Sequence, residues 1–173
     1  MEITARPALS EDRDAIRHLY EQTMREYIEA IWGWDQSWQD KDFASALQTS
    51  LTFVLESDAT LLGYFQIDQD ASHDYLRMLI LKPAARYAGI GAKVLSRILQ
   101  VAHDNGKALK LRVFKSNGGA KRFYEREGWT VLAEEEAFFL MGHSSSPSTD
   151  PLDESLQRAA KGYAFLLSAE FQP

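Results

Sequence analysis

The sequence predicts an α/β (α+β) domain: a mixed, mostly antiparallel sheet with helices on both faces. Three observations support this class. Apolar residues recur at helical spacing near the N-terminus. Three strand-like runs between residues 51 and 82 are joined by short polar turns, which is typical of an antiparallel meander. A strand–helix–strand unit over residues 75–113 implies a right-handed parallel crossover.

The first fifty residues predict a strand and two helices. Residues 2–8 alternate weakly and contain Pro7, which suits an edge strand. Ser10 is a good N-cap for a helix that the apolar spacing carries over residues 11–28. Residues 31–38 hold three of the four tryptophans, and residues 43–47 indicate a short second helix.

The rest of the domain continues the alternation. Strands are predicted over residues 51–55, 61–67 and 75–82, and the last of these is almost continuously apolar, as in a central strand. An amphipathic helix over residues 90–102 leads to a strand at 109–113. A helix over residues 117–126 and two final strands, 129–132 and 137–141, complete the pattern.

The chain changes character at His143, so we divide it into a domain over residues 1–142 and an appendage over residues 143–173. Residues 144–149 form a serine-rich linker, and Asp150 with Pro151 can start a helix. One apolar stripe predicts that this helix is amphipathic: Leu152, Leu156, Ala159, Tyr163 and Leu166. It could pack on its own domain, support a homodimer by docking on a second copy, or remain a poorly anchored terminus.

Composition excludes several kinds of chemistry. There is no cysteine, which rules out disulfides, zinc–thiolate and iron–sulfur sites and a thiol nucleophile. The four histidines never form a close pair, so we expect no metal site. The net charge of -6 argues against nucleic-acid binding and suits either a cationic substrate or solubility alone. With no apolar leader or spanning run, we expect no membrane association and a cytoplasmic location.

Residues 79–92 carry the strongest functional pattern: a buried strand, a short loop with two glycines and a long helix. Glycines let the backbone approach a ligand closely, and the free N–H groups of a helix start bind anions such as a pyrophosphate. A tight turn without a ligand is the alternative. Val94 replaces the third glycine of the dinucleotide fingerprint and no Gly-Lys-Ser/Thr follows, which disfavours a dehydrogenase or a nucleotide kinase.

Two motifs in this region resemble those of the GNAT superfamily of acyl-CoA N-acyltransferases. The loop is similar to the pattern Arg/Gln-x-x-Gly-x-Gly/Ala: Arg86-Tyr87-Ala88-Gly89-Ile90-Gly91-Ala92. Residues 117–129 are similar to Asn-x-x-Ala-x-x-x-Tyr followed by Gly-Phe, with Asn117, Ala120, Tyr124 and Gly128 in place and Trp129 where Phe is usual. The resemblance covers residues 2–142. More loosely, residues 27–35 look like a tryptophan-rich element of one bacterial subgroup.

The resemblance implies an N-acetyltransferase that moves an acetyl group from acetyl-CoA, a cosubstrate, to a primary amine of a small molecule or peptide. The diphosphate would lie on the N–H groups of residues 87–92. The pantetheine would pair with the central strand, which splays from its neighbour, at Leu79, Ile80 and Leu81. Asn117 would lie near the pantetheine or the substrate. Tyr124 would protonate the leaving thiolate, unless it is simply a core tyrosine.

The acceptor side is less defined. Glu26 and Asp35 are candidate bases, and each could instead be a solvated or capping carboxylate. Trp32 and Trp34 could be core residues or could wall a pocket for an organic cation with Asp35 as counter-charge, whereas core packing is favoured for Trp38. Two alternatives to an enzyme are kept open: a catalytically weak acyl-CoA-binding sensor or regulatory module of the same fold, and an interaction protein that uses the tail helix.

Overall fold

The computed structural model describes residues 1–143, 145, 163 and 165–167. The chain forms two compact units. The first comprises Met1–Ile67, Met78–Gly91 and Gly162–Pro173, and the second comprises Asp68–Arg77 and Ala92–Lys161. Three elements contain residues of both units: β3 (Thr60–Gln69), β4 (His73–Leu81) and α3 (Ile90–Asp104). Each unit is therefore tied to the other through regular secondary structure.

The strands of the first unit follow the order β8-β1-β2-β3-β4. Their bounds are β1 Ile3–Pro7, β2 Leu51–Ser57, β3 Thr60–Gln69 and β8 Phe165–Leu167. β1 pairs antiparallel with β2 and with β8, and β2 pairs antiparallel with β3. The predicted edge position of β1 is therefore wrong, because a strand from the distant end of the chain pairs with its outer side.

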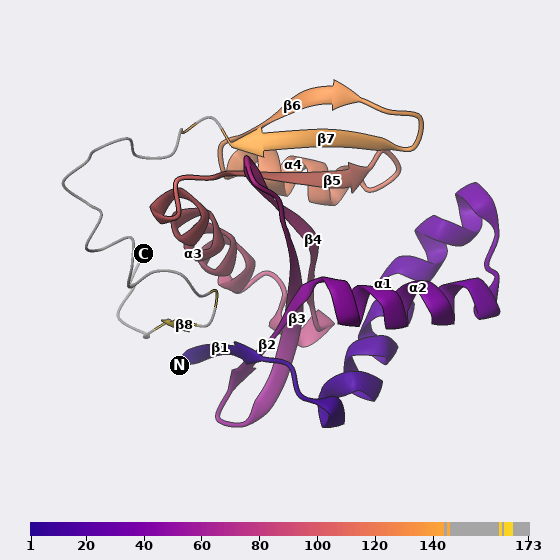
Figure 1. Ribbon diagram of the computed structural model, residues 1–173, viewed down its shortest axis with the longest axis horizontal. Coiled ribbons are helices and arrows are strands. Elements are labelled where there is room, and N and C mark those ends of the chain that lie inside the picture. Colours follow the sequence, from indigo (N-terminus) through magenta and orange to yellow (C-terminus); the bar gives the residue numbers. More distant parts are fainter. Residues whose placement is uncertain (144, 146–162, 164, 168–173) are drawn as a thin grey trace. The chain divides into compact units, whose positions relative to one another are not determined.

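Two helices cross this unit in Figure 1, α1 (Arg13–Trp32) and α2 (Gln36–Thr49). Ser10 does not cap α1 as predicted. It opens a 3-10 turn, η1 (Ser10–Asp12), and Asp12 stands at the helix N-cap. The Asp12 carboxylate makes no cap bond, because it accepts from the Arg6 guanidinium at 2.7 Å and 3.0 Å and from the Leu9 N–H. These bonds join the end of β1 to the start of α1.

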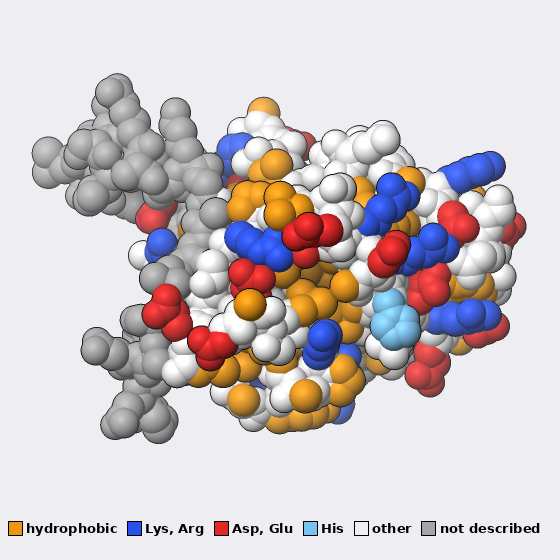
Figure 2. Space-filling view, turned by 90° about the horizontal axis from the view of Figure 1, so that it is seen from below, with side chains coloured by type: hydrophobic (Ala, Val, Ile, Leu, Met, Phe, Trp, Pro, Cys, Tyr) orange, Lys and Arg blue, Asp and Glu red, His pale blue; other side chains and the backbone are white. Residues whose placement is uncertain are grey.

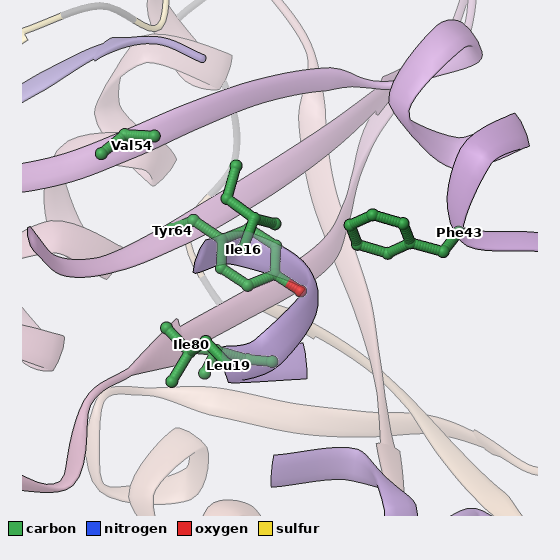
Figure 3. Close-up of a cluster of buried hydrophobic side chains, with 6 residues drawn as sticks. All are labelled: Ile16, Leu19, Phe43, Val54, Tyr64 and Ile80. Carbon is green, nitrogen blue, oxygen red and sulfur yellow. The ribbon is translucent and has the colours of Figure 1, made fainter. Parts of the chain in front are cut away.

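The core of the first unit lies between these helices and the sheet. Figure 3 shows side chains from five elements meeting there. Ile16 and Leu19 come from α1 and Phe43 from α2, while Val54, Tyr64 and Ile80 come from β2, β3 and β4. Burying apolar side chains of this size stabilises the fold by roughly 1.5–3 kcal/mol each. This core fixes the carboxyl end of β4 through Ile80.

The second unit has the strand order β4-β5-β7-β6, with bounds β5 Ala108–Phe114, β6 Trp129–Glu134 and β7 Phe138–His143. β4 and β5 are parallel, whereas β5/β7 and β6/β7 are antiparallel. Helix α4 (Gly118–Arg126) packs against β5 and β6, as Figure 1 shows. The completely buried Asp74 pairs with Lys107 at 3.4 Å and holds the start of β4 to the loop before β5.

The β4–β5 ladder is short. It runs from His73↔Ala108 to Leu76↔Leu111 and stops there, although β4 continues to Leu81 and β5 to Phe114. One parallel pair among antiparallel ones confirms the predicted mixed, mostly antiparallel α/β class. The expected splay of the central strands concerns the part of β4 after Leu76, for which the register gives no partner on β5.

The tail departs from prediction where it is described. Leu166, expected on the apolar stripe of a helix, lies in β8, and Tyr163 is buried with its ring 6.4 Å from that of Phe53. The remaining positions of the predicted helix lie outside the described residues. Across the described part of the chain, no helix combines the length and the hydrophobicity that crossing a membrane requires.

Candidate functional site

The carboxyl end of β4, with Leu79, Ile80 and Leu81, is held firmly within the first unit. Lys82 N–H donates to the Leu62 carbonyl at 2.8 Å. Gly63 lies so close to β4 that a Cβ there would collide with the Ile80 carbonyl oxygen and meet the Leu81 Cα at 2.9 Å. Only glycine permits this approach. The strand that should receive the pantetheine therefore has a rigid backing.

The loop after β4 makes two unusual backbone turns. A 3-10 turn, η2 (Pro83–Ala85), buries Ala85. Tyr87 and Gly89 then take left-handed φ values of 65° and 74°. The Arg86 side chain turns back, and its Nε donates to the Leu81 carbonyl at 2.9 Å. Arg86 thus serves as a brace for the loop, a role that its place in the motif did not reveal.

The loop leads into α3, and the backbone N–H groups at the start of this helix have no carbonyl partner within it. Ile90 and Gly91 open the helix, so their N–H groups have no partner within it. The helix dipole adds positive potential at this end. A Cβ on Gly89 would meet nothing within 4 Å, so the backbone is accessible there. This geometry suits a diphosphate. Ala92 was also predicted to contact the diphosphate. It follows Gly91 in α3 and is the first residue of that helix that belongs to the second unit.

In the second unit, Asn117 is the N-cap of α4. Its Oδ1 accepts from the Ala120 N–H at 3.1 Å, and its own N–H donates to the Phe114 carbonyl at 2.9 Å. Within the described part of the chain, its side-chain nitrogen makes no hydrogen bond. Asn117 therefore positions α4 and keeps a donor for a ligand.

Tyr124 is half-buried on α4 between aromatic neighbours. Its ring centroid lies 5.2 Å from that of Phe123 and 6.1 Å from that of Trp129, both edge-on. Burial raises the pKa of the Tyr124 phenol to about 12, and the nearby Tyr75 adds to the shift. The phenol is therefore protonated throughout the neutral range, as a hydrogen-bond donor to a thiolate must be.

Sequence reasoning did not select Tyr75, which lies near Tyr124, or Arg112, which lies over the Tyr75 ring. The Arg112 guanidinium lies 5.4 Å from the Tyr75 ring centroid and binds the Glu135 carboxylate at 2.8–3.1 Å. The pairing of Tyr75 with Lys110 brings this ring to Arg112 two residues further along β5. Strand register, which residue patterns do not specify, was the missing information.

The candidate acceptor residues lie on α1 and α2 of the first unit. Glu26 is exposed on α1. Asp35 is the N-cap of α2, where its carboxylate accepts from the Trp38 N–H at 3.0 Å. Of the two roles weighed for Asp35, capping is thus visible in the structure, and Glu26 is a solvated carboxylate.

The tryptophans are not core residues as a group. Trp38 is 59% exposed, so its predicted core role is wrong, and Trp32 is 60% exposed. Trp34 is half-buried and donates from Nε1 to Gln36 at 3.0 Å. The Arg25 guanidinium lies 5.1 Å from the Trp34 ring centroid, so a cation of the protein itself occupies this aromatic surface.

An open depression lies along α1 beside these residues. Six side chains of the helix line it: Glu21, Gln22, Arg25, Glu26, Glu29 and Ala30. Arg25 is 3.6 Å from Glu29, which offsets part of the negative charge. Figure 2 likewise shows basic and acidic side chains intermingled on the face that it presents, not gathered by sign. No group of His, Asp or Glu among the described residues could hold a metal ion.

The family follows from comparison with known proteins. A sequence profile for the acetyltransferase (GNAT) domain matches residues 18–139, well over half of the chain. The protein belongs to the GNAT acetyltransferase family. The profile spans both motifs, the loop that opens α3 and α4 with Tyr124, and confirms the resemblance.

Solved structures agree on the GNAT fold. The PaiA N-acetyltransferase from Thermoplasma acidophilum, solved with coenzyme A, superposes with a TM-score of 0.68 at 19% identity, over 84% of this chain and 100% of that one. The ribosomal-protein-S18-alanine N-acetyltransferase from Escherichia coli gives 0.65 at 19% identity, over 86% and 96%. No curated protein matches this GNAT chain.

Proposed function

We propose that this GNAT protein is an acetyl-CoA-dependent N-acetyltransferase acting on a primary amine of a small molecule or peptide. The observation that carries the proposal is the loop between β4 and α3. Its left-handed residues Tyr87 and Gly89 present the unpaired N–H groups of the α3 start to an anion. The coenzyme A held by the related PaiA structure supports the choice of ligand.

The residues present suit coenzyme A. The N–H groups of residues 87–92 would bind the diphosphate, whose negative charge the helix dipole favours. The backbone of Leu79, Ile80 and Leu81 would bind the amides of pantetheine as an added strand would. The short β4–β5 ladder supports this, because β4 extends five residues beyond its last pair with β5, at Leu76.

The reaction then needs three events. A neutral amine attacks the acetyl carbonyl, forming a C–N bond, and its proton leaves to a base or to water. A backbone N–H stabilises the oxyanion of the tetrahedral intermediate. The C–S bond breaks, and the Tyr124 phenol, which is protonated at neutral pH, donates to the thiolate. Direct transfer is favoured over an acyl-enzyme because the chain has no cysteine to acylate.

Two carboxylates, Glu26 and Asp35, are the candidates for the base that takes the amine proton. Glu26 could take the amine proton from its exposed position on α1. Asp35 is less suited, because one of its oxygens already caps α2. The capping role of Asp35 also favours the second candidate function, a catalytically weak acyl-CoA sensor, because a sensor requires no base.

Two measurements separate these functions. Isothermal titration calorimetry with coenzyme A and acetyl-CoA should show binding, and an absence of binding at high micromolar concentration would end both proposals. A thiol-release assay with acetyl-CoA and a panel of primary amines should then show amine-dependent turnover. Binding without turnover on any amine of the panel would favour the sensor.

A further inference from the structure

Tyr87 has a conformation that neither packing nor backbone preference explains. Its side chain is fully exposed, at 102% relative accessibility, and its ring contacts no other described residue. Its φ of 65° is left-handed. For residues other than glycine this conformation is sterically unfavourable, because it brings the Cβ close to the following carbonyl oxygen. A large aromatic ring is thus held in solvent at a conformational cost.

The surrounding loop keeps this ring outward. Arg86, the preceding residue, is fixed by its bond to the Leu81 carbonyl, and Ala85 is buried. Tyr87 therefore follows an anchored segment, and its strained backbone is the point at which the chain turns toward Gly89 and α3. No element of the described chain covers it.

The chemistry of coenzyme A supplies an occupant for the ring. The diphosphate carries pantetheine at one end and 3′-phosphoadenosine at the other. With the diphosphate at the start of α3 and the pantetheine along β4, the adenosine extends from the loop toward solvent. Tyr87 is two residues from Gly89, so their Cα atoms are within about 7 Å. The tyrosine ring therefore lies within reach of a base attached to that diphosphate.

We infer that the Tyr87 ring stacks on the adenine of coenzyme A and that the left-handed backbone presents the ring for this contact. The inference rests on the proposed function. Stacking between an aromatic side chain and a base needs no hydrogen bond, which agrees with a Tyr87 hydroxyl that bonds to no other described residue. Removing such a contact weakens binding by about fivefold to 150-fold per base.

The test compares two variants on two ligands by calorimetry. Tyr87→Phe keeps the ring. Tyr87→Asn removes it but tolerates the left-handed backbone, since Asn is among the residues that adopt it readily. The ligands are coenzyme A and 4′-phosphopantetheine, which keeps the pantetheine and one phosphate and lacks the 3′-phosphoadenosine 5′-phosphate half. We expect Tyr87→Asn to weaken coenzyme A binding about fivefold or more and 4′-phosphopantetheine binding less than twofold, with Tyr87→Phe matching the wild type on both.

Each other outcome has a definite meaning. If Tyr87→Asn binds coenzyme A as tightly as the wild type, stacking is refuted while the proposed function stands. If it loses affinity equally for both ligands, the side chain acts through the loop backbone and the inference is again overturned. If the wild type binds no coenzyme A, the proposed function itself fails.

Discussion

At the scale of single residues, Tyr124 offers the most direct test of mechanism. Phenylalanine at this position keeps the ring against Phe123 and Trp129 and removes only the hydroxyl. If the phenol protonates the thiolate, Tyr124→Phe should lower kcat by about 100-fold or more, the scale of general acid catalysis. Coenzyme A affinity should stay nearly unchanged. Steady-state kinetics and calorimetry on the same preparation check both, and unchanged kcat with chemistry rate-limiting would remove the role.

The environment of Tyr124 also makes a prediction about stability and pH. Its pKa is raised from about 10 to about 12, so the folded protein retains this proton after the unfolded chain has lost it. The free energy of unfolding should therefore fall as pH rises from about 10 toward 12, by roughly 1–3 kcal/mol more in the wild type than in Tyr124→Phe. Below about pH 10, the difference in the free energy of unfolding between the wild type and Tyr124→Phe should be constant. Urea unfolding at stepped pH values measures this free energy. If the wild type and Tyr124→Phe lose stability in parallel between about pH 10 and 12, the raised pKa of Tyr124 is contradicted.

At the scale of elements, substitutions at the start of α2 can distinguish two roles of the Asp35 carboxylate, as a helix cap and as a counter-charge for the substrate. Asp35→Ala removes the bond to the Trp38 N–H and should cost about 0.5–2 kcal/mol of stability. Asp35→Asn keeps a capping oxygen and removes the charge. Thermal unfolding should therefore rank wild type and Asp35→Asn together, above Asp35→Ala. An amine KM that rises in Asp35→Asn would show that the charge also serves the acceptor.

In the proposed function, the turn into α3 is the element on which coenzyme A binding would depend. Gly89→Val has room for its side chain but forces a β-branched residue into a φ of 74°. The loop should distort, and coenzyme A affinity should fall about tenfold or more as the anion-binding N–H groups are displaced. Gly89→Asn, which tolerates this φ, is the matched control and should bind more tightly than Gly89→Val. Equal affinities in the two variants would argue against the loop as the binding site.

At the scale of the whole molecule, Tyr163 and strand β8, which follow His143 in the chain, belong to the first unit. β8 pairs with β1, and Tyr163 is 1% exposed beside Phe53. Truncation after His143 should lower the melting temperature by several degrees, and Tyr163→Ala alone should cost about 3 kcal/mol, as for other large buried aromatics. Light scattering on the same samples tests the proposed homodimer. An unchanged melting temperature would mean that the tail adds nothing to folding.

Prediction from sequence succeeded where a local pattern carries the information. Helix α3 and strands β2, β3 and β5 follow from apolar spacing within their own residues, and Gly89 and Tyr124 from motifs of fixed spacing. It failed where the outcome depends on competing contacts in the folded chain. Ser10 was expected to cap α1, but Arg6 and Leu9 bind Asp12 instead. Trp38 was expected in the core because it is large and apolar, but it lies in the first turn of α2 with 59% of its surface exposed.

By itself the sequence determined the family, the mixed sheet and the loop that opens α3, because periodicity and motif spacing are local properties of a chain. The tertiary structure alone decided that β8 flanks β1, that Arg86 braces the loop, and that Tyr75 lies near enough to Tyr124 to raise its pKa. The position of β8 and the approach of Tyr75 to Tyr124 depend on which strands pair and in which register, whereas the Arg86 bond depends on how the loop after β4 turns back. Register is set by packing across the folded chain, and no run of neighbouring residues encodes it.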